Sequence, residues 1–270
     1  MDPAASRPRA PIDAPETRPI DSIWLGRADY RPVWALQKQL AGARASDEIP
    51  DRLLLVEHPA VLTLGRQADE RHVLADAAEL ARRRIELIRV ERGGEVTYHG
   101  PGQLVAYPIV GLSRRGLLLR PFVRALEAAM VTTCAAFGVA ADRRDGHPGS
   151  WVDVEGPNPR KIGALGIRVE RGVSYHGIAL NVDPDLADFD LIDACGMPGV
   201  RSTSIAAELG RPGELRSTAT IEQAGAIFAR AFTESIGAAL RGHGALGGSA
   251  DAADDGAVPA EPARVMAAVR

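Results

Sequence analysis

Short apolar runs alternate along this chain with longer stretches that repeat with the period of a helix. Tyr30 to Leu40 has helical spacing with Pro32 near its first turn, whereas Leu53 to His58 is an apolar run of the length of a buried strand. Pro121 to Phe137 has the strongest helical pattern, and it ends at Gly138. The same patterns predict strands at 61–64, 85–90, 95–99, 104–110, 151–154, 161–168 and 173–182, and helices at 73–84, 203–209 and 220–240.

Strands and helices are mixed in this order rather than strictly alternating. The last two strands are joined by Glu170-Arg171-Gly172, which is typical of a hairpin turn. Strands that follow one another directly favour an α+β fold over repeated βαβ units. We therefore predict a single α+β domain with a central mixed or antiparallel sheet flanked by helices.

Both ends of the chain differ in composition from the middle. Residues 1–20 carry prolines at positions 3, 8, 11, 15 and 19, and residues 242–270 form a low-complexity segment. Such segments bury too little apolar surface to offset the entropy of ordering them. We predict tails at 1–20 and 242–270 and one folded catalytic domain at 21–241.

Bulk composition excludes several classes of protein. The 270 residues are 46% hydrophobic and 25% charged, with a formal net charge of −3, so no broad basic field favours nucleic acid or an anionic membrane. The sequence contains no apolar run of the length of a membrane span and no apolar core of a secretory signal. We expect a cytoplasmic monomer whose two cysteines stay reduced and bind no metal.

Lysine is the rarest basic residue. Of the 32 lysines and arginines only Lys38 and Lys161 are lysines, and Lys161 stands beside an arginine in a glycine-bearing strand. A solvated positive charge there could equally be an arginine. A lysine, unlike an arginine, can act as an acid, a base or a thiolate partner at accessible pH.

The two cysteines occupy different settings. Cys134 lies in the apolar stretch of the helix at 121–137 and is expected to be a small buried hydrophobic residue. Cys195 lies among Asp193, Gly196 and Pro198 in a loop, a setting more typical of a presented nucleophile. If Lys161 lies within hydrogen-bonding reach, its ammonium would favour the Cys195 thiolate.

A polar, glycine-rich segment lies between two predicted strands. It can be a tight hairpin, which explains its glycines, or a place where the backbone approaches a ligand, which also gives its polar side chains a role. No phosphate-binding loop or dinucleotide fingerprint is present. The candidate binding residues are Arg92, Gly93, Gly94, Glu95, Val96, Thr97, Tyr98 and His99.

Two neighbouring strands also carry small residues. Glycine inside a strand removes a packing side chain, so these positions indicate either an open slot or a sheet closely covered by a helix. The predicted walls of the slot are Leu165, Ile167, Ile178 and Leu180. Such walls favour a linear alkyl chain. The candidate residues of the slot are Ala164, Leu165, Gly166, Gly177, Ile178 and Ala179.

Six motifs in order carry a resemblance to a known family. They are Glu57-His58-Pro59, Leu64-Gly65-Arg66, RGGEVTYHGPGQLVAYP at 92–108, RKIGALGIRV at 160–169, YHGIALNV at 175–182, and CGM at 195–197 with the later Thr203-Ser204. Together they resemble the lipoyl(octanoyl) transferases, acyltransferases that share a catalytic fold with lipoate and biotin protein ligases. The resemblance covers about Leu53 to Ala207.

The resemblance implies an acyl-enzyme mechanism without a metal or dissociable cofactor. Cys195 would take an octanoyl group from octanoyl acyl carrier protein, and Lys161 would lower the pKa of the thiol and relay protons. The acceptor would be a lysine of a lipoyl domain, in a 2-oxoacid dehydrogenase E2 subunit or in the glycine-cleavage H protein. The candidate segments above would bind the acyl group, and backbone amides, His99 or Thr97 would stabilise the oxyanion.

The chain departs from the family pattern at two places near the proposed catalytic residues. Ala194 stands where the family often has proline, and an inserted Gly156-Pro157-Asn158-Pro159 precedes Arg160. Two other readings remain: an ATP-dependent lipoate protein ligase, which needs no cysteine, and a non-catalytic acyl-binding module. Dependence on ATP and Mg²⁺ would identify the first, and an inert Cys195 would identify the second.

Overall fold

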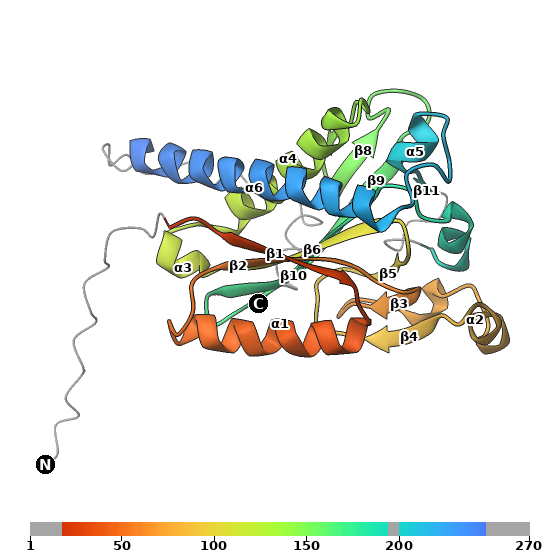
Figure 1. Cartoon of the computed structure of the whole chain (residues 1–270), viewed down its shortest axis with the longest axis horizontal. Coiled ribbons are helices and arrows are strands. Elements are labelled where there is room, and N and C mark those ends of the chain that lie inside the picture. Colours follow the sequence, from red (N-terminus) through yellow and green to blue (C-terminus); the bar gives the residue numbers. More distant parts are fainter. Residues whose placement is uncertain (1–17, 194–199, 247–270) are drawn as a thin grey trace, which may run out of the picture.

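The structure is a computed structural model that describes residues 18–193 and 200–246, arranged as two sheets with helices on their outer faces (Figure 1). The larger sheet has eight strands, in the order β1-β2-β6-β10-β9-β8-β7, with β11 paired to β9. Its strands are β1 (Asp21–Arg27), β2 (Arg52–Glu57), β6 (Gln103–Ile109), β7 (Asp142–Arg144), β8 (His147–Val152), β9 (Arg160–Glu170), β10 (Val173–Asn181) and β11 (Arg201–Ser202).

Both sheets are mixed. In the larger one the β1/β2 and β11/β9 pairs are parallel and the other pairs are antiparallel. The smaller sheet has the order β4-β3-β5, in which β3/β4 is parallel and β3/β5 antiparallel. Its strands are β3 (Val61–Leu64), β4 (Glu86–Arg89) and β5 (Val96–His99).

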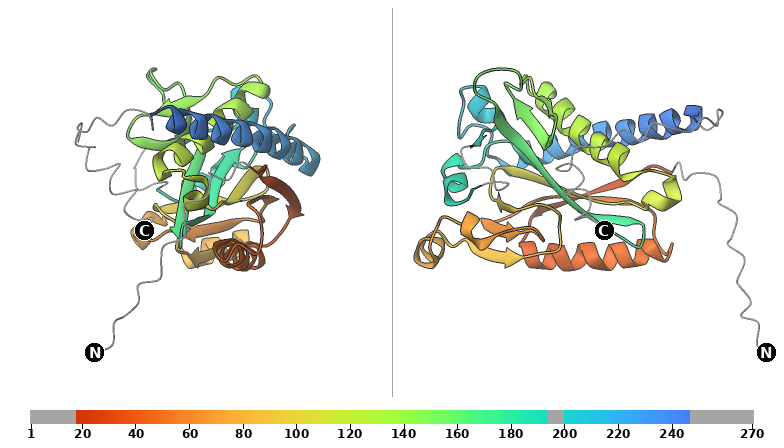
Figure 2. Two further views of the ribbon diagram at one scale, coloured as in Figure 1. Left: turned by 90° about the vertical axis from the view of Figure 1, so that its left-hand side faces the viewer. Right: turned by 180° about the vertical axis from the view of Figure 1, so that it is seen from behind.

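Helices cover both faces of the large sheet, and Figure 2 shows the same layers from two other sides. The helices are α1 (Tyr30–Ala45), α2 (Ala77–Arg83), α3 (Leu112–Arg115), α4 (Leu119–Ala136), α5 (Ile205–Glu208) and α6 (Thr218–Leu246), with 3-10 turns η1 (Glu70–His72) and η2 (Leu186–Leu191). Helices α4 and α6 pack on one face through Phe122, Phe228 and Phe232. Helix α1 covers the other face through Val33. The predicted α+β fold is confirmed.

The hairpin between β9 and β10 forms where the sequence predicts it. Arg171 and Gly172 both have positive φ, at 49° and 78°, which gives a two-residue connection the twist of its flanking strands. Positive φ costs little at glycine, which explains Gly172 at the second position. The hairpin sets the register in which Gly177 faces Gly166 and Ala179 faces Ala164. The small residues of the two strands are therefore direct neighbours.

Several predicted boundaries move for local reasons. The helix predicted at 73–84 begins only at Ala77, because the Asp76 side chain caps the Glu79 amide and Val73 instead bridges to Ile192. The helix predicted at 203–209 begins after Ser204, whose hydroxyl accepts from the Ala207 amide. Strands β1, β7 and β11 and helix α3 were not predicted.

The ends of the folded part lie close to the limits of the described residues. Strand β1 begins at Asp21, and α6 continues to Leu246, beyond residue 241 where we placed the end of the domain. Residues 1–17 and 247–270, which include most of both predicted tails, lie outside the described residues. Across residues 18–193 and 200–246, no helix is both long enough and apolar enough to cross a bilayer.

Candidate functional site

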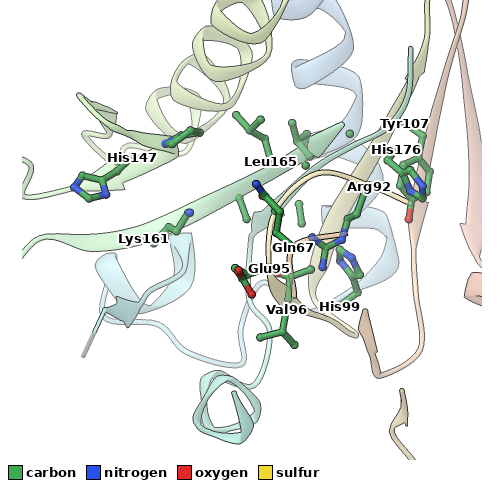
Figure 3. Close-up of a pocket in the computed structure, with 18 of the residues that line it drawn as sticks. Gln67, Arg92, Glu95, Val96, His99, Tyr107, His147, Lys161, Leu165 and His176 are labelled. Carbon is green, nitrogen blue, oxygen red and sulfur yellow. The ribbon is translucent and has the colours of Figure 1, made fainter. Parts of the chain in front are cut away.

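A cavity of about 440 Å³ lies against β9 and β10, with β5 and the loop before it on the opposite side (Figure 3). This volume is in the usual range for small-molecule sites. The candidate residues that line it are Arg92, Gly94, Glu95, Val96, Thr97, His99, Lys161, Ala164, Leu165, Gly166, Gly177, Ile178 and Ala179. The glycine-rich loop and the two small-residue strands, which are far apart in sequence, therefore meet at one cavity.

Three predicted site residues are not among the lining residues. Tyr98 is buried on the other face of β5, where its hydroxyl donates to Asp188 at 2.6 Å and its ring packs against Phe189, so the structure does not bring it to the cavity. Gly93 instead joins the loop to β9, because its amide donates to the Ile167 carbonyl at 3.1 Å. Cys195 lies outside the described residues, as does Ala194.

The glycines of β9 have two different roles. A Cβ on Gly163 would lie 2.3 Å from Ser150 Oγ and 2.7 Å from Met130 Sδ, so this glycine permits close covering by β8 and α4. A Cβ on Gly166 would lie 2.7 Å from the Gly93 carbonyl oxygen, so this glycine permits the loop to cross the strand. Both glycines of β9 therefore allow close covering, Gly163 by β8 and α4 and Gly166 by the loop at 92–94.

All four predicted apolar walls lie in or against the core under α4 and α6, and two of them do not reach the cavity. Ile167 and Leu180 are buried beneath α4 and α6 and do not line the cavity. Leu165 and Ile178 do line it. Residues two apart on a strand share a face, so Leu165 and Ile167, like Ile178 and Leu180, differ in their position along the strand, which the alternation of side chains does not predict.

Lys161 lies at one end of the cavity, with its side chain almost wholly buried at 8% exposure. Its Nζ lies 5.2 Å from the centre of the buried Trp151 ring, a favourable position for a cation. Gly149 makes room for it, because a Cβ there would lie 3.0 Å from Lys161 Cε. The ammonium is thus held against an aromatic face in a closely packed surrounding.

The backbone at Lys161 is fixed on both sides. Trp151 of β8 is its register partner on one edge, and Ser202 of β11 is its partner on the other. The Thr203 amide also donates to the Lys161 carbonyl at 2.9 Å. The chain that follows the undescribed residues 194–199 therefore returns beside Lys161.

A buried carboxyl group interacts with the same end of the cavity. Burial raises the pKa of Glu127, while a hydrogen bond from the Gly149 amide and the charges of Arg124 and Lys161 act in the opposite direction. The Gly149 amide donates to Glu127 Oε1 at 3.1 Å. Lys161 therefore shares its surroundings with one acidic group.

The orientation of His99 follows from a chain of hydrogen bonds. Gln103 Nε2 donates to Asn181 Oδ1 at 2.9 Å, and Asn181 Nδ2 donates to the Thr203 carbonyl at 2.9 Å. Gln103 Oε1 must therefore accept from His99 Nδ1, at 2.8 Å. Burial lowers the pKa of His99 to about 3, so its ring is neutral at pH 7 and Nε2 is an acceptor. An acceptor cannot stabilise an oxyanion, which removes His99 from the candidates for that role.

The opposite end of the cavity holds aromatic and polar residues that sequence reasoning missed. Tyr30 stacks on His99 at 5.9 Å between ring centres, and Tyr107 donates to His58 Nε2 at 2.9 Å. Burial raises the pKa of Tyr30 to about 12 and that of Tyr107 well above its usual range, so both remain protonated. Over the whole cavity, the additional lining residues are Tyr30, Gln67, Tyr107, Gly146, His147, Pro148 and His176, of which His147 lies on the Lys161 side (Figure 3).

Most of these residues carried no signal in the sequence. Tyr30 begins α1 and reaches the cavity only because α1 packs across β10 and β6. Tyr107 and His176 do lie inside the motifs at 92–108 and 175–182, and His176 also has a positive φ of 56°, which is uncommon outside glycine. Its position in a predicted strand gave no indication of that conformation.

Residues 29–233 match the family model described as the lipoyl protein ligase A/B catalytic domain, a span that includes every lining residue of the cavity. The chain belongs to this family. An octanoyltransferase of Chloroflexus aurantiacus is 46% identical over 215 residues, which cover 78% of this chain and 95% of the relative. An octanoyltransferase of Aromatoleum aromaticum is 46% identical over 199 residues, covering 74% of this chain and 80% of the relative.

A solved structure supports the fold. The bi-partite lipoate protein ligase from Thermoplasma acidophilum superposes with a TM-score of 0.55 at 15% identity, covering 93% of this chain and 92% of the ligase. At that identity the likeness concerns the fold alone. The expected lipoate ligase-like architecture is confirmed.

Proposed function

We propose that this protein is an octanoyltransferase that moves an octanoyl group from octanoyl acyl carrier protein to a lysine of a lipoyl domain. The observation that carries the proposal is the cavity itself, in which a buried lysine ammonium stands at one end of a lining of small and apolar residues. Ala164, Leu165 and Ile178 give it an apolar lining that suits a linear chain. Relatives that match most of the chain bear the same name.

The proposed first step is attack of the Cys195 thiolate on the thioester of the donor. A new thioester forms on Cys195, and the carrier's phosphopantetheine thiolate leaves and takes up a proton. Lys161 is proposed to favour the thiolate through its charge and to return that proton. The pairing of β11 with β9 supports this role, because the chain that carries Cys195 continues into the register partner of Lys161.

In the second step the amine of the acceptor lysine attacks the acyl-enzyme. An amide bond forms, the bond to Cys195 Sγ breaks, and the lysine's proton passes to the sulfur through Lys161. We propose lipoyl domains of 2-oxoacid dehydrogenase E2 subunits and the glycine-cleavage H protein as acceptors. The Thermoplasma ligase was studied with its E2 lipoyl domain, which supports this class of acceptor. The mechanism needs a reduced cysteine, which is the reason we place the protein in the cytoplasm.

Intact-mass spectrometry after incubation with octanoyl acyl carrier protein tests the proposal. We expect one added octanoyl mass, removed by hydroxylamine and located on the Cys195 peptide. Cys134→Ser is the matched control, since Cys134 is fully buried in α4 and burial raises the pKa of its thiol to about 12. That variant should still be acylated.

Three results would contradict the mechanism. The first is a wild-type protein without an adduct, and the second is a hydroxylamine-labile adduct that persists in Cys195→Ser. The third is acyl transfer that needs ATP and Mg²⁺, which would identify a lipoate protein ligase instead. If the wild-type protein forms no adduct but still binds the lipoyl domain, it is a non-catalytic acyl-binding module.

A further inference from the structure

The cavity changes in character along its length (Figure 3). Lys161 lies at one end, small and apolar residues form the middle, and His176 lies with Tyr107 at the other end. The register of the two strands separates these ends, because His176 pairs with Ile167, six residues along β9 from Lys161. Their backbones are therefore separated by no more than about 20 Å along the strand. An extended octanoyl chain is shorter than this span.

His176 is buried without a hydrogen-bond partner on its ring. The residue is 1% exposed, and neither Nδ1 nor Nε2 is hydrogen-bonded to another described residue. The nearest carboxylate oxygen, Glu91 Oε2, lies 3.9 Å from Nε2, which is too long for a hydrogen bond. Leaving buried polar atoms unpaired costs stability, so each such group in a folded protein calls for a reason.

A second unpaired polar atom lies close by. Gln37 of α1 is fully buried, and its Oε1 accepts from the His176 backbone amide at 2.9 Å. Its Nε2 makes no hydrogen bond of normal geometry among the described residues, although it lies near enough to the Tyr107 hydroxyl to lower the pKa of that group. Gln37 also contributes to holding His176 at its positive φ of 56°. Strained residues of this kind persist where the surroundings hold them, and they gather at ligand sites.

We propose that the His176 end of the cavity is a subsite for a hydrogen-bonding group at the distal end of the acyl chain, such as a terminal hydroxyl. The inference rests on the proposed function for the identity of the chain. A methyl-ended octanoyl group stops short of this end, and the ring nitrogens, which are closed to solvent in this structure, stay unpaired. A longer methyl-ended chain would also leave them unpaired, whereas a terminal hydroxyl would pair with one of them once the imidazole turns toward the chain.

Binding of free acids tests the subsite without any transfer step. Calorimetric titrations would compare decanoic, dodecanoic and tetradecanoic acid with their ω-hydroxy forms, with octanoic acid as the reference. We expect the ω-hydroxy form to bind about tenfold more tightly at the chain length that reaches His176, the effect of one buried hydrogen bond. In His176→Leu the preference should vanish or reverse in favour of the methyl-ended acid.

Two further variants separate the subsite from general damage to β10. His176→Asn keeps a polar side chain that tolerates positive φ and should keep part of the preference. Tyr175→Phe changes the adjacent residue, which does not line the cavity, and should bind both acids as the wild type does. If His176→Leu fails to fold, Gln37→Met tests the same end from α1 and should weaken the preference.

Equal affinities for hydroxylated and methyl-ended acids at every length in the wild type would overturn the inference, as would a preference that survives His176→Leu. The outcome is independent of the proposed function. Octanoyl transfer without a hydroxyl preference would refute the subsite alone. A hydroxyl preference in a protein that transfers no acyl group would refute the transferase alone.

Discussion

Replacing Gly166 by alanine adds a methyl group to the contact between β9 and the loop at 92–94. The added Cβ would lie 2.7 Å from the Gly93 carbonyl oxygen and 3.4 Å from Arg92 Cδ. The first distance is too short for a stable contact, and the obstacle is backbone. The loop must therefore move away from β9.

The magnitude follows from what anchors the loop. Displacing the loop weakens the hydrogen bond from the Gly93 amide to the Ile167 carbonyl and those from Arg92 to Thr63 Oγ1 and O. We expect the equivalent of one hydrogen bond to be lost, which costs about 1 kcal/mol of stability. Overpacking costs about 1 kcal/mol or more in addition. A total of about 2 kcal/mol lowers the Tm of a domain of this size by about 4–8 °C. Because Arg92 and Gly94 line the cavity, octanoyl transfer should fall by about ten- to a hundredfold.

Thermal denaturation followed by circular dichroism, with octanoyl transfer to a lipoyl domain, measures both effects. Gly42→Ala is the matched control, because a Cβ there meets only Arg171 Nη2 at 3.7 Å and the residue lies within α1. That change should leave Tm unchanged or raise it slightly. An unaltered Tm and unaltered transfer in Gly166→Ala would refute the assignment of this glycine to the loop contact.

Three further predictions concern single groups. Lys161→Arg keeps the charge but removes the proton relay, so kcat should fall by about a hundredfold while Tm changes little; near-wild-type turnover would show that charge alone suffices. Burial lowers the pKa of His58 to about 4 and that of His99 to about 3, below the unfolded value near 6.5, so protonation favours unfolding. The free energy of unfolding should be steady above about pH 6.5. Between pH 6.5 and about 4 it should fall by up to about 1.4 kcal/mol per pH unit for each histidine. Urea titrations that show no such fall would contradict the prediction that both histidines are neutral in the folded protein. Tyr98→Phe removes the hydrogen bond to Asp188, so it should lower the free energy of unfolding by about 1 kcal/mol and leave octanoyl transfer unchanged. Loss of transfer in a fully stable variant would indicate that Tyr98 contacts the substrate.

Local chemistry predicted much of the fold. The turn at Arg171-Gly172 and the apolar run of β2 depend on neighbouring residues, and both formed as expected. Strand β1 was missed because it lies at the edge of the sheet and most of its residues are exposed or half-buried, so it lacks the apolar run of a central strand. Elements whose formation depends on neighbouring residues in the sequence, such as this turn and this strand, were therefore predicted correctly.

The site was harder to predict where it depends on which side of a strand is covered. Tyr98 and His99 are adjacent on a short polar strand, and only the packing of Phe189 decides that Tyr98 turns away from the cavity. Leu165 and Ile167 lie on the same face of β9, yet only Leu165 lines the cavity, a difference of position along the strand that the sequence pattern does not give. Tyr30 could not be found at all, because it reaches His99 through the packing of α1.

The hydrogen-bond chain from His99 to the Thr203 carbonyl has a direction, and its last acceptor is main chain. The side of the imidazole that carries the proton is therefore set by the path of the backbone before α5, not by the side chain at position 203. Any replacement of Thr203 that preserves this path leaves the tautomer of His99 unchanged. Asn181→Asp would deprive the Thr203 carbonyl of its donor, but the carboxylate would still accept from Gln103 Nε2, so the change should cost stability and keep the same tautomer.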